Sequence, residues 1–462
     1  MKKRIPSFLL VIAMMIYMWC WCGEQFYALE AHRLQWGQDF AFFQRILNSA
    51  VAGGEWTSSL LLEPTGFFSM VHFHPVLAVI VPLWALFSTP KLLLAINVLA
   101  VVATAWPLAR IGSKQTNSSV FGLCCGVAWL VWLPAHGAAI ADFRPMVFLI
   151  PGLACVVAGA MDGSKRWLLF GAVLCCMARE EASYLLVVAG LVLSLFPLGG
   201  GRRSGLALVG VGAVWFGFLL VFKENFFFHF NPVETIRGFG SGASVPPELT
   251  DARIGFVRSA WLGGYLAAPL SLNTLGIGGG AAAWLFTDTH REWHAITGTV
   301  VYLKDPLVVI IAAAGTLGAG ILVRKRPSAA LLVGLVMIIS NQLSYSSDRS
   351  RLKERMSSLR DEAESEEVLE IDRLISSVPK SARVATDYRL IADFADRAVL
   401  WNVAHLYMED APPPHWEDDW PLTLELLDTV VLPIDDPFVD RLSVGWGLVD
   451  QGGGYGVWLR EG

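Results

Sequence analysis

Long apolar runs alternate with short polar interruptions over the first 345 residues of the chain. A window of about 20 residues, the length of helix that crosses a bilayer, detects eleven apolar segments. Two regions are less regular: 166–178 is short for a span, and the Gly-rich 256–287 forms either two spans or one re-entrant pair. The eleven segments are 5–22, 91–109, 118–135, 145–161, 166–178, 182–198, 205–222, 256–270, 273–287, 299–323 and 328–344. The pattern predicts a polytopic α-helical membrane protein of about 11 spans.

Segment 75–88 is apolar but short, and Pro75 and Pro82 interrupt it. Lys and Arg gather in the cytoplasmic loops of membrane proteins, and the basic clusters of this chain share one side only if 75–88 does not cross. We therefore expect 75–88 to be a juxtamembrane helix inside a large first external loop, 23–90, with the N-terminus cytoplasmic. The basic clusters are Lys2–Arg4, Arg110–Lys114, Lys165–Arg166, Arg202–Arg203 and Arg324–Arg326.

The composition changes abruptly after the last predicted span, so the chain divides into a membrane domain, 1–345, and a polar remainder. Residues 346–375 are charged, with apolar positions at helical spacing, and predict an amphipathic helix or linker. Short β-type runs in 376–462 predict a small α/β domain, extracytoplasmic by the same topology. The run Gly452–Gly456 lacks a following Lys-Ser/Thr, so it predicts a hairpin turn rather than a nucleotide loop.

Composition narrows the class of protein. Hydrophobic residues make up 54% of the chain and charged residues 16%, with a mean hydropathy of +0.52, values far from those of soluble proteins. The net charge of -5 is too small to imply a nucleic-acid partner. All seven cysteines lie in or beside apolar segments, which argues against a disulfide framework and against a zinc site.

Polar groups gather on the predicted external side. Asp39 precedes an apolar helical run, so it is either a helix cap or a catalytic base, and a helix start just above the bilayer would serve both roles. His72 and His74 precede Pro75, which favours an extended segment whose two rings point to opposite sides. Either one histidine faces a site or both are interfacial hydrogen-bonding groups.

Three further groups carry charge beside apolar segments. Asp142 and Arg144 form either a local ion pair or part of a phosphate clamp. The run Arg179–Glu181 places three charges in an apolar hairpin, where they must pair with one another or line a wet cavity. The segment His290–His294 offers cations to an anionic headgroup, or is an ordinary loop. Its candidate residues are His290, Arg291 and His294.

These elements resemble a known family: the bacterial membrane proteins catalogued as domain of unknown function 2079, grouped with the polytopic (GT-C fold) glycosyltransferases. The chain departs from the family where Arg144 replaces a frequent His, Arg179 a frequent Lys and Glu181 the usual Asp. The resemblance rests on Gly37–Phe40 with Gln44, on His72–Pro75, Asp142–Pro145, Arg179–Glu181 and His294, and on the start of the outer domain, Val378–Val384.

The resemblance implies a GT-C-like fold in the cytoplasmic (inner) membrane of a bacterium. It implies a glycosyltransferase that uses a polyprenyl-phosphate sugar donor and an extracytoplasmic glycan, lipid or protein acceptor, with inversion and with Asp39 as base. Membrane lipids are the other expected partners. No cofactor is certain, and a divalent metal stays an open alternative. The remaining candidates for substrate or lipid phosphate are Gln44, His72, His74, Asp142, Arg144, Arg179, Glu180, Glu181, His290, Arg291 and His294.

Two other readings remain open. A transporter or flippase of a lipid-linked or anionic solute would also place charges in spans and break helices with glycine, as near 275–280. The sequence shows no internal repeat, however, and its charges gather at the outer edge rather than at the midplane. In the other reading, the spans only anchor a binding domain that has no catalytic role.

Overall fold

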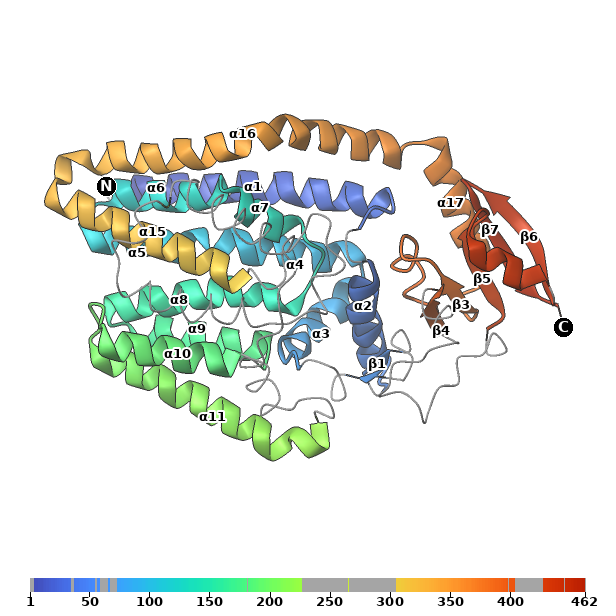
Figure 1. The fold of residues 1–462 in the computed structure, drawn as a ribbon, viewed down its shortest axis with the longest axis horizontal. Helices are drawn as coiled ribbons and strands as arrows, with labels where there is room; N and C mark the ends of the chain where they lie inside the picture. Colours follow the sequence, from blue (N-terminus) through green and yellow to red (C-terminus); the bar gives the residue numbers. More distant parts are fainter. Residues whose placement is uncertain are drawn as a thin grey trace, which may run out of the picture.

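The structure is a computed structural model. It describes residues 4–34, 37–54, 56–58, 65–66, 73–180, 182–226, 265, 305–397, 399–403, 427–443 and 445–461. A bundle of helices forms one part and a five-stranded sheet the other, and the long helix α16 (Ala330–Ala363) runs along the bundle toward the sheet (Figure 1). The two chain ends lie far apart, the N-terminus in the bundle and the C-terminus beyond the sheet (Figure 1).

The bundle is built from helices that follow the predicted apolar segments. In chain order they are α1 (Arg4–Glu30), α3 (Val76–Phe87), α4 (Pro90–Ala103), α5 (Ala105–Thr116), α6 (Ser119–Leu130), α7 (Leu133–Ile140), the 3-10 turn η1 (Pro145–Phe148), α8 (Leu149–Asp162), α9 (Lys165–Ala178), α10 (Ala182–Leu195), α11 (Arg202–Phe226), α15 (Asp305–Lys325), the turn η4 (Pro327–Ala329) and α16. Helix α1 continues eight residues beyond the predicted end of the first span, because Gly23–Glu30 stays helical.

The predicted number of spans is not confirmed. Among the described residues, four segments are long and apolar enough to cross a membrane, and a fifth counts if α6 and α7, bent by 54°, form one span. Helices α9 and α10 have 14 residues each, about 21 Å of rise against a hydrocarbon core of about 30 Å. The predicted spans 256–270 and 273–287 lie outside the described residues, except for Tyr265. The four segments are Ile5–Glu30, Pro90–Thr116, Pro145–Asp162 and Arg202–Val221.

Helices α8 and α9 approach each other closely because glycine lies at their contact. A Cβ atom added at Gly171 of α9 would lie 2.5 Å from the carbonyl oxygen of Gly152 and 2.7 Å from the amide nitrogen of Val156, both on α8. Backbone atoms cannot swing aside as a flexible side chain can. The two helices therefore keep this separation only while position 171 has no side chain.

The predicted boundary at residue 345 does not interrupt the secondary structure. Helix α16 runs through it as one element of 34 residues. After a short turn, the side chain of Ser365 caps α17 (Glu366–Ser377) by accepting a hydrogen bond from the amide of Val368 at 3.3 Å. The polar remainder of the chain is thus joined to the bundle by continuous helix. The division into domains at 345 and 375 stays a prediction.

The C-terminal part contains a mixed five-stranded sheet in the order β4-β3-β5-β7-β6. Strands β4, β3 and β5 are parallel, while β7 pairs antiparallel with both β5 and β6. The hairpin predicted at Gly452–Gly456 is confirmed: Gly453 and Gly454 form the turn with φ of 56° and 79°, as a type I′ turn requires. The strands are β3 (Arg383–Thr386), β4 (Val399–Asn402), β5 (Thr429–Pro433), β6 (Trp446–Gly452) and β7 (Tyr455–Arg460).

Helix α2 (Gly37–Val51) lies across the end of the bundle that faces the C-terminal part (Figure 1). Every residue from Phe40 to Leu47 is buried, so no side of this stretch faces solvent. Its apolar core joins both parts of the molecule: Leu77 and Ile80 of α3 belong to it, and so do Ile391 and Phe394 of the C-terminal part. The helix is therefore covered by the bundle on one side and by the C-terminal part on the other.

We predict that Gly171→Ala destabilises the protein by about 1–3 kcal/mol, the usual range for an overpacked contact. Thermal unfolding of the purified protein in detergent measures the effect. The matched control is Gly210→Ala on α11, because a Cβ atom there meets nothing within 4 Å. The control should leave the midpoint unchanged or raise it slightly, since alanine favours helix. Equal midpoints for the two variants would contradict the proposed close contact of α8 and α9.

Candidate active site at the end of the bundle

Asp39 lies in the first turn of α2. The amide groups at a helix N-terminus carry partial positive charge, which stabilises a carboxylate there. Phe43, four residues later, lies on the same face of the helix. Its ring contacts the ring of His74, at 5.6 Å between centroids, and that of Phe143, at 6.0 Å. The face of α2 that carries Asp39 therefore packs against two of the other predicted motifs.

Asp142 and Arg144 occupy the short segment between α7 and η1, where they are 1% and 5% exposed. The side-chain amide of Asn97 on α4 fixes the start of this segment by donating to three carbonyl oxygens at the end of α7. Such carbonyls have no partner within their own helix. Helix α4 thus sets the point from which the chain turns toward Asp142. The acceptors are Ala138 (3.1 Å), Ala139 (3.1 Å) and Ala141 (2.7 Å).

The turn between α9 and α10 holds two more buried charges, Arg179 and Glu180. Glu180 Oε2 accepts a hydrogen bond from the amide of Phe73 at 2.8 Å. His74 Nδ1 donates to the carbonyl oxygen of Ala178 at 2.6 Å. These two bonds hold the segment before α3 against the turn between α9 and α10.

Arg179 connects this turn to the segment that carries Arg144. Its Nη1 donates to the sulfur of Met146 at 2.7 Å, and Met146 lies in η1, two residues after Arg144. The turn after α9 is therefore bonded to the segment that follows Asp142 and carries Arg144.

The C-terminal part contributes Tyr388, which follows strand β3. The side chain is 39% exposed, but partial removal of its hydroxyl from water raises the pKa of that hydroxyl above the usual range. The negative charges of Asp39 and Asp142 raise this pKa further, while Arg144 opposes them. This hydroxyl therefore shares its surroundings with three of the predicted site residues. The backbone of Tyr388 lies close to the start of α2, because a Cβ atom added at Gly37 would be 3.0 Å from the carbonyl oxygen of Tyr388.

Two further hydrogen bonds hold the C-terminal part on α2. Asn402 of β4 donates to the side-chain oxygen of Gln38 at 2.8 Å. Arg45, which is 9% exposed, donates to the carbonyl oxygen of Arg397 at 2.7 Å. Hydrogen bonds from a buried cation are among the stronger polar contacts in proteins. These two hydrogen bonds therefore help to keep the C-terminal part, which carries Tyr388, against α2.

We call the assembled group the end cluster. Its member Gln44 lies on α2 and is 7% exposed, and the side-chain oxygen of Gln44 has no hydrogen-bond partner in the described part of the chain. Of the predicted residues, His72, Glu181, His290, Arg291 and His294 lie outside the described residues. Within the described ranges, no group of three or more His, Cys, Asp or Glu is arranged to hold a metal ion. The end cluster comprises Asp39, Gln44, His74, Asp142, Arg144, Arg179, Glu180 and Tyr388.

Sequence reasoning missed Tyr388 and one buried pair. Tyr388 has no motif around it, so only the fold brings it to Asp39. Glu24 of α1 lies 2.9 Å from His136 of α7 and 3.4 Å from the guanidinium of Arg355 on α16. Two polar residues, Glu24 and Gln25, in an otherwise apolar helix were the available signal.

The end cluster has the groups that acid–base chemistry on an anionic substrate requires. A carboxylate beside a helix N-terminus can accept a proton, and nearby guanidinium groups can stabilise a phosphate. Burial of Asp142, Arg144 and Arg179 strengthens their electrostatic effect relative to water. The arrangement therefore suits group transfer from a phosphate-linked substrate better than simple anion binding.

The comparisons with known proteins agree with the resemblance. Residues 32–223, which contain every member of the end cluster except Tyr388, match the sequence model of a family described as "Predicted membrane protein (DUF2079)". Over these residues the chain is similar to that family. The recognised family is thus confirmed. No curated protein matches the sequence.

Two crystal structures of ArnT from Cupriavidus metallidurans are similar in fold to the whole chain. The structure bound to undecaprenyl phosphate aligns with a TM-score of 0.59, and the apo structure with 0.56. Each alignment has 12% sequence identity and covers 98% of both chains. At this identity the likeness establishes the fold alone. The chain therefore has an ArnT-like GT-C fold with a C-terminal sheet, as predicted.

We predict that Glu180→Leu is less stable than Glu180→Gln by about 1–3 kcal/mol, because glutamine can still accept from the amide of Phe73 and leucine cannot. Thermal unfolding in detergent compares the two variants, whose side chains have similar volumes. Equal stability would show that the bond between Phe73 and Glu180 does not hold the two turns together.

Proposed function

We propose that this protein is a membrane glycosyltransferase that moves a sugar from a polyprenyl-phosphate-linked donor to an extracytoplasmic acceptor. The observation that carries the proposal is the gathering of Asp39, Asp142, Arg144 and Tyr388 at one end of a GT-C-type bundle. The crystal structure of ArnT bound to undecaprenyl phosphate supports the class of donor, since the two proteins share the fold.

In the proposed mechanism, Asp39 accepts the proton of the acceptor hydroxyl as that oxygen attacks the anomeric carbon of the sugar. The bond between this carbon and the phosphate oxygen breaks, and the anomeric configuration inverts. Arg144 and Arg179 stabilise the negative charge that develops on the departing lipid phosphate. Glu180 orients the turn that carries Arg179, through the amide of Phe73.

The lipid part of the donor explains why such a site lies at the end of a membrane bundle. Each prenyl CH₂ group buried in the bilayer contributes about 0.8 kcal/mol, so the membrane concentrates the donor beside the site. The topology proposed for the chain follows: the N-terminus is cytoplasmic, and the end cluster and the C-terminal part are extracytoplasmic, in the inner membrane of a bacterium.

We predict that Asp39→Asn abolishes the activity while the protein still folds, because asparagine keeps the shape but cannot accept the proton. Mass spectrometry of envelope glycans and glycolipids compares a deletion strain that carries wild-type or variant genes at equal expression. One sugar should be missing from a defined acceptor in the Asp39→Asn strain, and the lipid-linked donor should accumulate.

The matched control is Asp435→Asn, the same chemical change at an exposed loop position. It should restore the wild-type profile. A complete rescue by Asp39→Asn would remove Asp39 as the base.

A further inference from the structure

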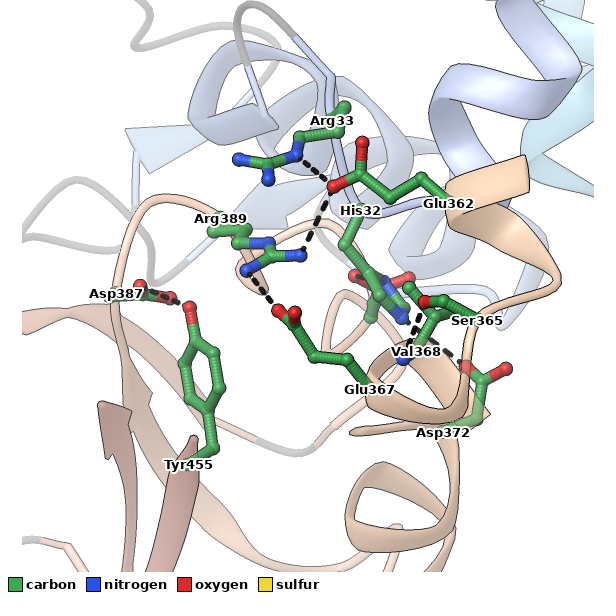
Figure 2. A network of polar contacts seen from close by, with 11 residues as sticks. His32, Arg33, Glu362, Ser365, Glu367, Val368, Asp372, Asp387, Arg389 and Tyr455 are labelled. Carbon is green, nitrogen blue, oxygen red and sulfur yellow. Dashed lines mark hydrogen bonds and ion pairs between the residues drawn. The ribbon is translucent and has the colours of Figure 1, made fainter. Parts of the chain in front are cut away.

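His32 lies between α1 and α2, seven residues before Asp39, and is 4% exposed. Its Nδ1 lies 2.8 Å from a carboxylate oxygen of Asp393. Its Nε2 lies 3.3 Å from a carboxylate oxygen of Asp372 (Figure 2). Both carboxylates belong to the C-terminal part. The Asp393 contact is the stronger of the two, because the side chain of Asp372 is 58% exposed and that of Asp393 only 19%.

The backbone of His32 has a φ of +54°, in the left-handed region. Residues other than glycine adopt this region rarely and at some cost in free energy, so the surroundings must hold the residue there. The conformation turns the chain between α1 and α2 and directs the imidazole into the C-terminal part. This placement connects the start of α2 to the loop that carries Tyr388.

The same loop, residues 387–393, is tied down at three points (Figure 2). At its start, Asp387 accepts a hydrogen bond from the Tyr455 hydroxyl of β7 at 2.8 Å. In its middle, Arg389 forms an ion pair with Glu367 of α17 at 3.1 Å. At its end, Asp393 meets His32. Asp387 and Arg389, the residues on either side of Tyr388, are thus both held in place. Of these three contacts, the one with His32 joins the loop to the bundle.

A second pair of contacts lies next to His32 on the bundle side. Arg33 contacts Glu362 of α16 at 2.5 Å, and Arg389 approaches the same carboxylate at 3.7 Å (Figure 2). The charged groups that face His32 are therefore Asp372 on α17 and Asp393 and Arg389 on the loop, with Arg33 and Glu362 beside them. Two of the three direct neighbours are acidic, which favours the protonated imidazole.

We propose that His32 is a positioning residue: as a cation it clamps the loop 387–393 onto the start of α2, so that Tyr388 is held beside Asp39. The clamp positions two residues of the end cluster, Tyr388 and Asp39, and its importance for catalysis rests on the proposed function. The clamp itself does not depend on which reaction occurs there. When His32 loses its proton, Asp393 loses its charged partner and the loop loosens.

The direction of the pH effect follows from the charges. Burial lowers the pKa of His32, but the hydrogen bond and charge of Asp393, with the charge of Asp372, outweigh it and raise the pKa above 6.5, while Arg389 opposes them. A group whose pKa is raised on folding stabilises the folded state fully below its unfolded pKa. That stability is lost as the pH rises from 6.5 through the folded value. The clamp therefore holds at mildly acidic pH and opens as the pH rises through the folded pKa of His32.

Hydrogen–deuterium exchange of the full-length protein in detergent tests the clamp, with rates corrected for the intrinsic effect of pH. We expect the segments 387–397 and 37–47 to exchange about tenfold faster near pH 9 than near pH 6. In His32→Asn, which tolerates the left-handed backbone and cannot become charged, both segments should exchange at the faster rate at every pH. In Asp393→Asn the transition should move to lower pH, because the charge that raises the pKa of His32 is gone.

The matched control is Arg373→Gln, which breaks an exposed ion pair with Asp450 within the C-terminal part, 2.7 Å long. It should leave both segments as in the wild type. Wild-type exchange that does not change with pH, or a transition in Asp393→Asn at the wild-type pH, would overturn the proposal, and so would wild-type exchange in His32→Asn. The readout is exchange and not sugar transfer, so an Asp39→Asn strain that retains transfer would contradict the proposed function and leave the clamp intact.

Discussion

The structure depends on the burial of α2 on all sides. A helix that is buried around its whole circumference cannot be covered by a single surface, so it needs a partner on each side. The bundle covers the face of Phe43, and Ile391 and Phe394 of the C-terminal part lie in the same apolar core. Because Asp39 is on this helix, the position of the candidate base is fixed by the contact between the two parts of the molecule.

Burial also explains why the charges of the end cluster are held so tightly. A charge removed from water is costly unless hydrogen bonds and opposite charges replace the water, and each of the buried turns is held in this way. Glu180 accepts from the amide of Phe73, and Asn97 satisfies the carbonyls before Asp142. The bundle contributes rigid helices, and polar contacts at the helix ends hold the charged side chains in the end cluster.

Much of the fold could be predicted from the sequence, because local patterns determine it. Apolar runs located the helices, β-type runs located the strands, and Gly453 and Gly454 indicated the hairpin turn. The number of spans was less predictable, since a run of apolar residues does not show whether its helix is long enough to cross. The bend between α6 and α7 shows this, because one apolar run became two helices.

The candidate site was predictable only where charges interrupt apolar sequence, as at Asp142 and Arg179. Tyr388 and His32 carry no such signal, because a polar residue in a polar segment is ordinary until the fold gives it a neighbour. Their placement argues against the reading in which the spans merely anchor a binding domain. The bundle alone would lack Tyr388, and the C-terminal part alone would lack Asp39 and leave the apolar surface around Ile391 uncovered. Only the two parts together complete the end cluster, so its chemistry belongs to the whole chain.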